Sequence, residues 1–189
     1  PSLIRGGHNT YEVVFSDEPM TAPQWMVDML VCLNEDTYLF HVARLHAESI
    51  VVYDPDVFTP TGKGIFVPVP FKKLKKEHTI HQQMVNTIAL GASLGLLGAQ
   101  LTHLENIIRE EFGRKGDDVV TFNIKLAQVG FDYVKDLPQV KPILVQQSNA
   151  LPKIVVTGND AYSIATIAAD CRYYAAYPMT PSSTVLSTL

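Results

Sequence analysis

The sequence is poor in cysteine, in net charge and in long apolar runs. Its two cysteines, Cys32 and Cys171, fit neither a disulfide framework nor a cluster-binding motif. The longest apolar stretch, residues 88–101, is interrupted by glycines and is too short to cross a bilayer. The net charge of −4 argues against general nucleic-acid binding. We therefore expect no membrane segment, no nucleic-acid partner and a reducing, cytoplasmic location.

The chain does contain enough apolar residues to fold. They make up 47% of its 189 residues, which suffices for the core of an ordinary globular protein. Between residues 135 and 152 the composition shifts to prolines and a polar Gln-Gln-Ser-Asn run, which is typical of an interdomain linker. We predict a first domain over residues 1–134, a linker over 135–151 and the start of a second domain over 152–189. Because the second domain stops early, we expect a piece of a larger polypeptide.

The first domain begins with patterns typical of an α/β fold. Residues 11–15 predict a strand, and two apolar runs at 27–33 and 50–53 predict parallel strands. Between those two runs, Asn34 is positioned to cap a helix that extends to about residue 46. Residues 64–70 predict either an edge strand or an extended segment, because the prolines within them exclude a central position in a sheet.

Three helices are predicted to follow. The first covers residues 82–97, the second opens with a capping box of Thr102 and Glu105 and ends at Gly113, and the third is capped by Asp117. Helical spacing predicts the inward faces of the second and third helices. These faces comprise Leu101, Leu104, Ile107, Ile108 and Phe112, and then Phe122, Leu126, Val129 and Tyr133.

The second domain opens with a predicted strand, helix and strand. The strands are residues 154–156 and 173–176, and Asn159 is positioned to cap the helix between them. One small-residue face of that helix is predicted to pack inward. It comprises Ala161, Ile164, Ala165, Ala168 and Ala169.

The loop at residues 177–183, Tyr-Pro-Met-Thr-Pro-Ser-Ser, is the strongest candidate site. Pro178 and Pro181 frame Thr180 and restrict the backbone, so the Thr180 hydroxyl is aimed with little freedom left to lose. Ser182, with Ser183 and Thr184, suits the cap of a following helix, which would place backbone N–H groups near a bound carboxylate.

This second segment resembles the start of the pyrimidine-binding α domain of the 2-oxoacid:ferredoxin oxidoreductases. Members of that family carry a close variant of GNEAIALGAIAAGCRFYAAYPITPSS, from which Asp160, Tyr162 and Met179 differ without removing the threonine or its flanking prolines. The first domain resembles the γ domain of the same family, whose glycine-rich opening would lie upstream of Pro1. The matching elements are Arg5-Gly6-Gly7, Ser16-Asp17-Glu18-Pro19, Asn86 with Leu90-Gly91-Ala92, Leu104-Glu105, Asn123 and Gly130.

A γ domain followed by an α domain is similar to the fused large subunit of 2-oxoglutarate-type members. The resemblance implies a three-layer αβα γ domain with a mixed sheet, followed by the first βαβ unit of a second α/β domain. It also implies oxidative decarboxylation of a 2-oxoacid, with 2-oxoglutarate favoured, on thiamine diphosphate with Mg²⁺. The acyl group passes to coenzyme A and the electrons pass through 4Fe-4S clusters to ferredoxin. The chain has no cysteine series or acidic metal motif, so we expect a partner β subunit to hold these cofactors and this chain alone to bind none.

The resemblance assigns roles to residues in both domains. We expect Thr180 to donate a hydrogen bond to the oxo or carboxylate oxygen of the 2-oxoacid, with Pro178, Pro181 and Ser182 in the same substrate site. Arg5, Gly6 and Gly7, followed by His8, suggest an anion nest for coenzyme A, although a tight turn that pairs Arg5 with an acidic neighbour is the favoured explanation. Two further groups are weaker candidates, for coenzyme A phosphates and for a metal respectively: Lys72, Lys73, Lys75 and Lys76, and the pair His78 and His81.

Two other function classes stay open at this point. The γ part can be a non-catalytic module that supports the assembly and covers coenzyme A. Alternatively, the chain can be an unrelated nucleotide-binding α/β domain in which the order of helices and strands is coincidental. A 2-oxoacid-dependent and coenzyme A-dependent reduction assay on the full-length protein with its partner separates the three.

Overall fold

The computed structural model describes residues 8–16, 20, 22–77, 84–135, 137, 154–177, 179–180 and 182–189. Its internal contacts divide the chain into two compact units, Pro1–Gln146 and Gln147–Leu189. Most of the predicted linker lies outside the described residues, so the limits of the two domains stay a prediction.

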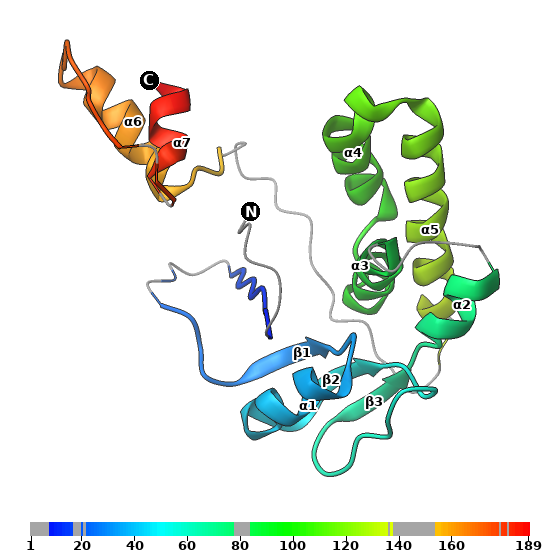
Figure 1. Ribbon diagram of the computed structural model, residues 1–189. Coiled ribbons are helices and arrows are strands. Elements are labelled where there is room, and N and C mark those ends of the chain that lie inside the picture. The colour runs from blue at the N-terminus through cyan, green and yellow to red at the C-terminus, as the bar shows by residue number, and fades with distance from the viewer. Residues whose placement is uncertain are drawn as a thin grey trace. The chain divides into compact units, whose positions relative to one another are not determined.

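A parallel sheet forms the centre of the first unit (Figure 1). Its strands β1 (Val27–Val31), β2 (Leu45–Tyr53) and β3 (Ile65–Pro68) lie in the order β1-β2-β3. Strand β3 lies at the edge, as its prolines predicted. Both pairings are parallel, so the predicted mixed sheet is not found among the described strands. Residues 11–15 form no strand, which corrects the sequence prediction.

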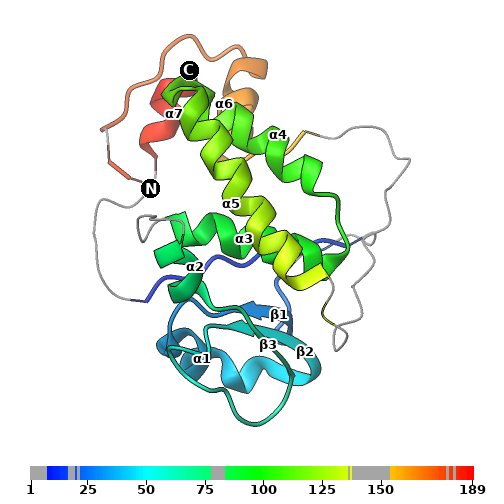
Figure 2. The same cartoon turned by 90° about the vertical axis from the view of Figure 1, so that its right-hand side faces the viewer.

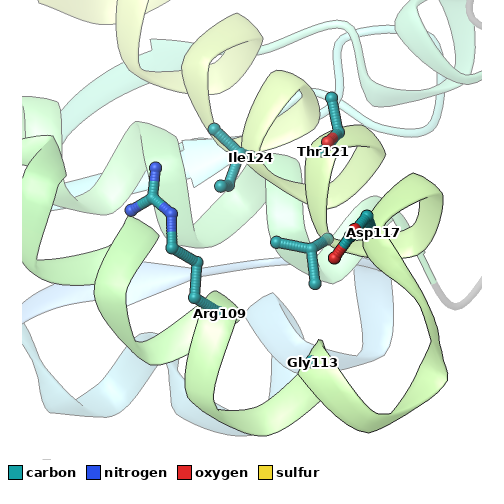
Figure 3. A pocket seen from close by; sticks show the side chains of 6 residues that line it. Arg109, Gly113, Asp117, Thr121 and Ile124 are labelled. Atoms are coloured by element: carbon teal, nitrogen blue, oxygen red, sulfur yellow. The ribbon is translucent and has the colours of Figure 1, made fainter.

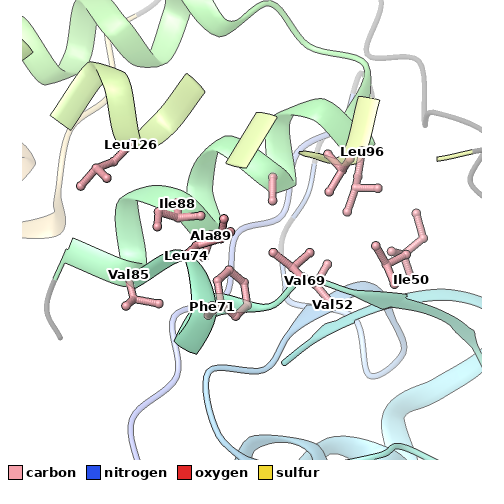
Figure 4. Packing of buried hydrophobic residues seen from close by; sticks show 13 residues of the cluster. Ile50, Val52, Val69, Phe71, Leu74, Val85, Ile88, Ala89, Leu96 and Leu126 are labelled. Atoms are coloured by element: carbon pink, nitrogen blue, oxygen red, sulfur yellow. The ribbon is translucent and has the colours of Figure 1, made fainter. Parts of the chain in front are cut away.

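Alternate side chains of β2 face two different helical layers, because successive residues of a strand point to opposite sides. Ile50 and Val52 pack with Ile88 and Leu96, which lie on helix α3 (Val85–Leu97) (Figure 4). Val51 packs on the other side with Cys32, Tyr38 and Phe58. Burying one such side chain stabilises the fold by about 1.5–3 kcal/mol. The α/β class and the three layers are thereby confirmed (Figure 2).

The helices of the first unit are α1 (Glu35–His41), α2 (Phe71–Glu77), α3 (Val85–Leu97), α4 (Leu101–Phe112) and α5 (Asp117–Lys135). Two 3-10 turns, η1 (Val42–Arg44) and η3 (Gly113–Lys115), follow α1 and α4. The Asn34 cap is confirmed, because its side chain accepts a hydrogen bond from the Thr37 N–H at 2.9 Å. The α1 helix ends earlier than predicted because the chain enters β2 at Leu45.

The predicted capping box of α4 is wrong. Gly98 ends α3 in a left-handed conformation, and the chain is helical again from Leu101, so Thr102 is already inside the helix. Glu105 instead pairs with Arg109 one turn later, with 3.2 Å between the carboxylate and the guanidinium.

The inward faces of α4 and α5 are narrower than predicted. Leu101, Leu104 and Ile108 are buried on α4, whereas 55% of Ile107 is exposed. On α5, Leu126 is fully buried, while 40% of Tyr133 is exposed. Leu101, Leu104 and Ile108 lie along one helix face and pack with Ala127 of α5, so a residue beside that stripe points to solvent.

The second unit contains α6 (Gly158–Ala168) and α7 (Ser183–Thr188), which pack against each other. The predicted strands at 154–156 and 173–176 are not formed. No neighbouring strand supplies hydrogen bonds to them within the described residues, and Val155 is fully exposed. The small-residue face predicted on α6 is also exposed, and the buried residue of that helix is Ser163.

No helix in the described part of the chain is long and apolar enough to span a membrane.

Candidate functional site

The start of α6 differs from its prediction in a way that matters for the site. Thr157, not Asn159, caps the helix: its hydroxyl accepts from the Asp160 N–H, and the Asp160 carboxylate accepts from the Thr157 N–H at 2.8 Å. Hydrogen bonds from the Thr157 hydroxyl and backbone lower the pKa of Asp160. The side chain of Asn159 is therefore not needed for capping, and its Nδ2 donates to the Thr184 hydroxyl at 2.6 Å.

The loop that carries Thr180 is folded by backbone hydrogen bonds. The Met179 N–H donates to the Tyr177 carbonyl at 2.8 Å, and the Met179 carbonyl accepts from the Ser182 N–H at 3.0 Å. Thr180 is the second residue of the turn that this last bond closes, and it is exposed. The hydroxyl is thus presented at the surface on a backbone that is held on both sides. Pro178 and Pro181 lie outside the described residues, so their framing role stays a prediction.

Ser182 stands directly before α7, as predicted, but its side chain does not cap that helix. Its hydroxyl donates instead to the Met179 carbonyl at 2.9 Å. The Ser182 side chain therefore stabilises the turn around Thr180 and does not cap the N-terminus of α7. Its place beside the substrate site is a prediction that no contact in this structure tests.

A second candidate lies at the carboxyl ends of β1 and β2, where open parallel sheets usually bind ligands. Asp54 follows β2 and is almost fully buried. Its carboxylate accepts from the Lys72 N–H at 2.7 Å and from the Asp56 N–H at 2.9 Å. A hollow of about 70 Å³ adjoins it, lined by Leu33, Asp54, Val57, Phe71, Lys72, Lys75 and Val85. Asp54 follows the predicted strand at residues 50–53, and no sequence motif marks it as a binding residue.

The four lysines of α2 do not act as one cluster. Helical spacing places Lys72 and Lys75 at this hollow, whereas Lys73 pairs with Glu77 at 3.9 Å. The Lys72 ammonium donates to the Asp56 carbonyl at 3.3 Å. Two of the four cations therefore remain candidates for attracting an anion here.

A larger groove of about 500 Å³ lies between α4 and α5 (Figure 3). It is lined by Arg109, Gly113, Asp117, Val120, Thr121 and Ile124. The Arg109 guanidinium donates to Glu105 at 3.2 Å and to Asn106 at 3.3 Å. The arginine is thus already paired with a carboxylate, and the other charged side chain that lines the groove is Asp117.

The roles predicted for the remaining candidate residues stay predictions. Arg5, Gly6, Gly7, His78 and His81 lie outside the described residues. Within the described part of the chain, no group of three or more His, Cys, Asp or Glu side chains is arranged to hold a metal ion.

The two cysteines do not have the environment of iron ligands. Burial raises the pKa of the Cys32 thiol to about 12, which opposes the thiolate that iron needs. Cys171 is exposed, and its thiol donates to the Tyr173 carbonyl at 3.2 Å. The described residues therefore do not fit an iron–sulfur cluster.

Comparison with known proteins identifies the family. Residues 1–133 match the family described as pyruvate ferredoxin/flavodoxin oxidoreductase. This chain belongs to that family. The match covers the whole described sheet and helices α1 to α5 up to residue 133, and it confirms the family resemblance derived from the sequence motifs.

Individual relatives of the family extend the likeness. The 2-oxoglutarate synthase subunit KorC of Archaeoglobus fulgidus is 25% identical over 140 residues, which cover 74% of this chain and 71% of that protein. Subunit alpha of 2-oxoacid:ferredoxin oxidoreductase 2 from Aeropyrum pernix is 22% identical over 231 aligned residues, covering 96% of this chain.

One solved structure is similar in fold and sequence. It is the 2-oxoglutarate:ferredoxin oxidoreductase of Magnetococcus marinus with 2-oxoglutarate, coenzyme A and succinyl-CoA bound, at a TM-score of 0.72 and 27% identity. The similarity covers 85% of this chain. The chain spans 36% of the Aeropyrum subunit and 29% of the Magnetococcus chain.

Proposed function

We propose that this chain is part of a 2-oxoacid:ferredoxin oxidoreductase that converts a 2-oxoacid and coenzyme A to an acyl-CoA while reducing ferredoxin. The similarity to the Aeropyrum α subunit covers 96% of the chain and therefore extends over both units. We favour 2-oxoglutarate as the substrate, because the Archaeoglobus relative and the Magnetococcus structure are both named for it. A cytoplasmic location stays a prediction.

The observation that carries this proposal is the turn that presents Thr180. Its backbone is held by the Met179–Ser182 bond, while the residue itself is exposed. An exposed hydroxyl on a fixed backbone can donate to a substrate oxygen without first ordering the loop. We assign Thr180 as the donor to the oxo or carboxylate oxygen of the 2-oxoacid. Such a bond contributes about 0.5–1.5 kcal/mol, and more when the acceptor is charged.

We propose that a different subunit binds the thiamine diphosphate, Mg²⁺ and 4Fe-4S clusters of the reaction. The described residues fit neither a 4Fe-4S cluster nor the Mg²⁺ that accompanies thiamine diphosphate. We therefore propose a β subunit as the partner that binds thiamine diphosphate, with ferredoxin as the electron acceptor. For coenzyme A, we propose that Arg5, Gly6 and Gly7 contribute to its site.

The test uses the full-length protein purified with its partner subunit. We expect reduction of a low-potential dye that requires both a 2-oxoacid and coenzyme A, with 2-oxoglutarate as the best substrate. Thr180→Ala should abolish most of this activity while the assembly stays intact. Thr166→Ala is the matched control, because that hydroxyl donates only to the Tyr162 carbonyl of its own helix at 2.8 Å.

The alternatives predict other results. Activity that is indifferent to Thr180→Ala would favour a non-catalytic assembly module. A complete absence of activity with every 2-oxoacid tested would contradict the proposed reaction. The family match already argues against an unrelated nucleotide-binding domain.

A further inference from the structure

The bond between Asn159 and Thr184 joins the first turns of two helices that are 25 residues apart in sequence. Asn159 is the second residue of α6, and Thr184 is the second residue of α7. The Asn159 Nδ2 donates to the Thr184 hydroxyl at 2.6 Å. Thr157 and Asp160 already cap the N-terminus of α6. The Asn159–Thr184 contact is therefore not needed to cap that helix.

The contact acts together with apolar packing. Val185, the residue after Thr184, is buried to 3% exposure, and Ser163 of α6 is fully buried. The Ser163 hydroxyl donates to the Asn159 carbonyl at 2.9 Å. The first turn of α7 is thus joined to α6 by one side-chain hydrogen bond, and the residue next to that bond on α7 is a buried aliphatic one.

The Thr180 turn runs directly into this anchored helix. Ser182 closes the turn through the Met179 carbonyl and also precedes the first residue of α7, Ser183. No flexible spacer separates the turn from the helix, so a rotation of α7 on α6 moves Thr180 with it.

We infer that Asn159 and Thr184 are positioning residues for the substrate-binding hydroxyl of Thr180. Neither is assigned a contact with the substrate. The Asn159–Thr184 bond fixes the rotation of α7, and α7 fixes the turn on which Thr180 is carried. The inference rests on the proposed function for its kinetic consequence, but its structural consequence can be measured separately.

The sharpest variant is Thr184→Val, which removes the hydroxyl and keeps the shape of the side chain. Asn159 makes a further interaction, so Asn159→Ala alone removes more than one contact. The double variant and the two single variants form a double-mutant cycle, which gives the interaction energy between the two side chains. Thr184→Ser retains the hydroxyl and should restore the wild-type behaviour.

Thr188→Val is the matched control. Thr188 lies on the same helix, and its hydroxyl donates only to the Thr184 carbonyl at 2.9 Å. The substitution is chemically identical to Thr184→Val but leaves the link between α6 and α7 unchanged.

In the full-length protein with its partner, we expect Thr184→Val to raise KM for the 2-oxoacid by about two- to tenfold, the effect of losing one hydrogen bond. KM for coenzyme A should not change, whereas a general loss of folding would lower the yield of active enzyme without this selectivity. Two results would overturn the inference. One is the same KM for the 2-oxoacid in Thr184→Val and Thr188→Val. The other is a KM in Thr184→Ser that is raised as much as in Thr184→Val.

Amide hydrogen exchange of the same full-length variants supplies a readout that does not need activity. Thr184→Val should speed exchange of the Met179 and Ser182 amides, and Thr188→Val should not. If the wild type turns over no 2-oxoacid, the proposed function fails, and exchange still decides whether the bond orders the turn. Unchanged exchange at both amides would contradict the positioning role.

Discussion

Gly130 of α5 lies against the backbone of Ile88 in α3. A Cβ atom at residue 130 would be 2.0 Å from the Ile88 carbonyl oxygen, and one at Gly91 would be 1.9 Å from the Ala127 carbonyl oxygen. The two helices therefore cross at a distance that only glycine permits. This crossing forms part of the layer that covers one face of the sheet.

We expect Gly130→Ala to destabilise the first unit by about 1–3 kcal/mol, because the added methyl group forces the helices apart. Gly113→Ala is the control, since a Cβ there has nothing within 4 Å. Urea unfolding of the two variants measures the difference. Equal midpoints for Gly130→Ala and the wild type would show that the helices are not in contact at this point.

Asp54 is predicted to hold α2 against the end of β2. Asp54→Asn keeps the size of the side chain but replaces one acceptor oxygen with a donor, which leaves a backbone N–H of Lys72 or Asp56 unpaired in a buried place. We expect a loss of about 1–3 kcal/mol in the free energy of unfolding. Asp56→Asn should have little effect, because the Asp56 side chain is exposed and only its N–H is bonded to Asp54.

The two thiols should differ sharply in reactivity. Cys32 is fully buried and its pKa is raised to about 12, whereas Cys171 is exposed. An aromatic disulfide reagent at pH 8 should therefore modify Cys171 in the native protein and Cys32 only after unfolding. Cys171→Ser should abolish the native reaction. Rapid labelling of that variant would contradict the buried position of Cys32.

The Thr157–Asp160 capping box predicts a pH dependence for the second unit. The pKa of Asp160 is lowered from its ordinary value of 3.8, so the folded state favours the carboxylate. The resulting stabilisation is fully present above the unfolded-state pKa and is lost as the pH falls through the folded-state pKa. In a carbon-detected NMR titration, Thr157→Ala should raise the pKa of Asp160 towards 3.8. An unchanged pKa would show that the box is not formed.

Helix caps illustrate what could be predicted from local sequence. Asn34 and Asn159 both precede helical patterns, and Asn34 caps its helix as predicted. Asn159 does not, because Thr157 and Asp160 stand at the capping-box spacing and already form the capping hydrogen bonds at the start of α6. The same sequence contains both signals, and competition between neighbouring caps decides which one forms.

Features that depend on distant partners could not be predicted from the chain alone. Residues 154–156 have the composition of a strand but form none, since a strand requires a neighbour to hydrogen-bond with. Ile107 fits the helical spacing but lies beside the contact stripe of α4. In the candidate site, the proline-framed Thr180 was recognisable from sequence. The Asn159–Thr184 bond was not, because it joins residues 25 positions apart.

The most direct test of the account is kcat/KM for 2-oxoglutarate, measured on the full-length protein with its partner for wild type, Thr180→Val and Thr180→Ser. With the carboxylate of the 2-oxoacid as the acceptor, the charge-assisted hydrogen bond contributes about 1.5–3 kcal/mol, so we predict a fall of about ten- to a hundredfold for Thr180→Val. With the neutral oxo oxygen as the acceptor, the fall is smaller. Thr180→Ser should retain most of the activity. Equal kcat/KM values for all three proteins would contradict a substrate-binding role for the Thr180 hydroxyl.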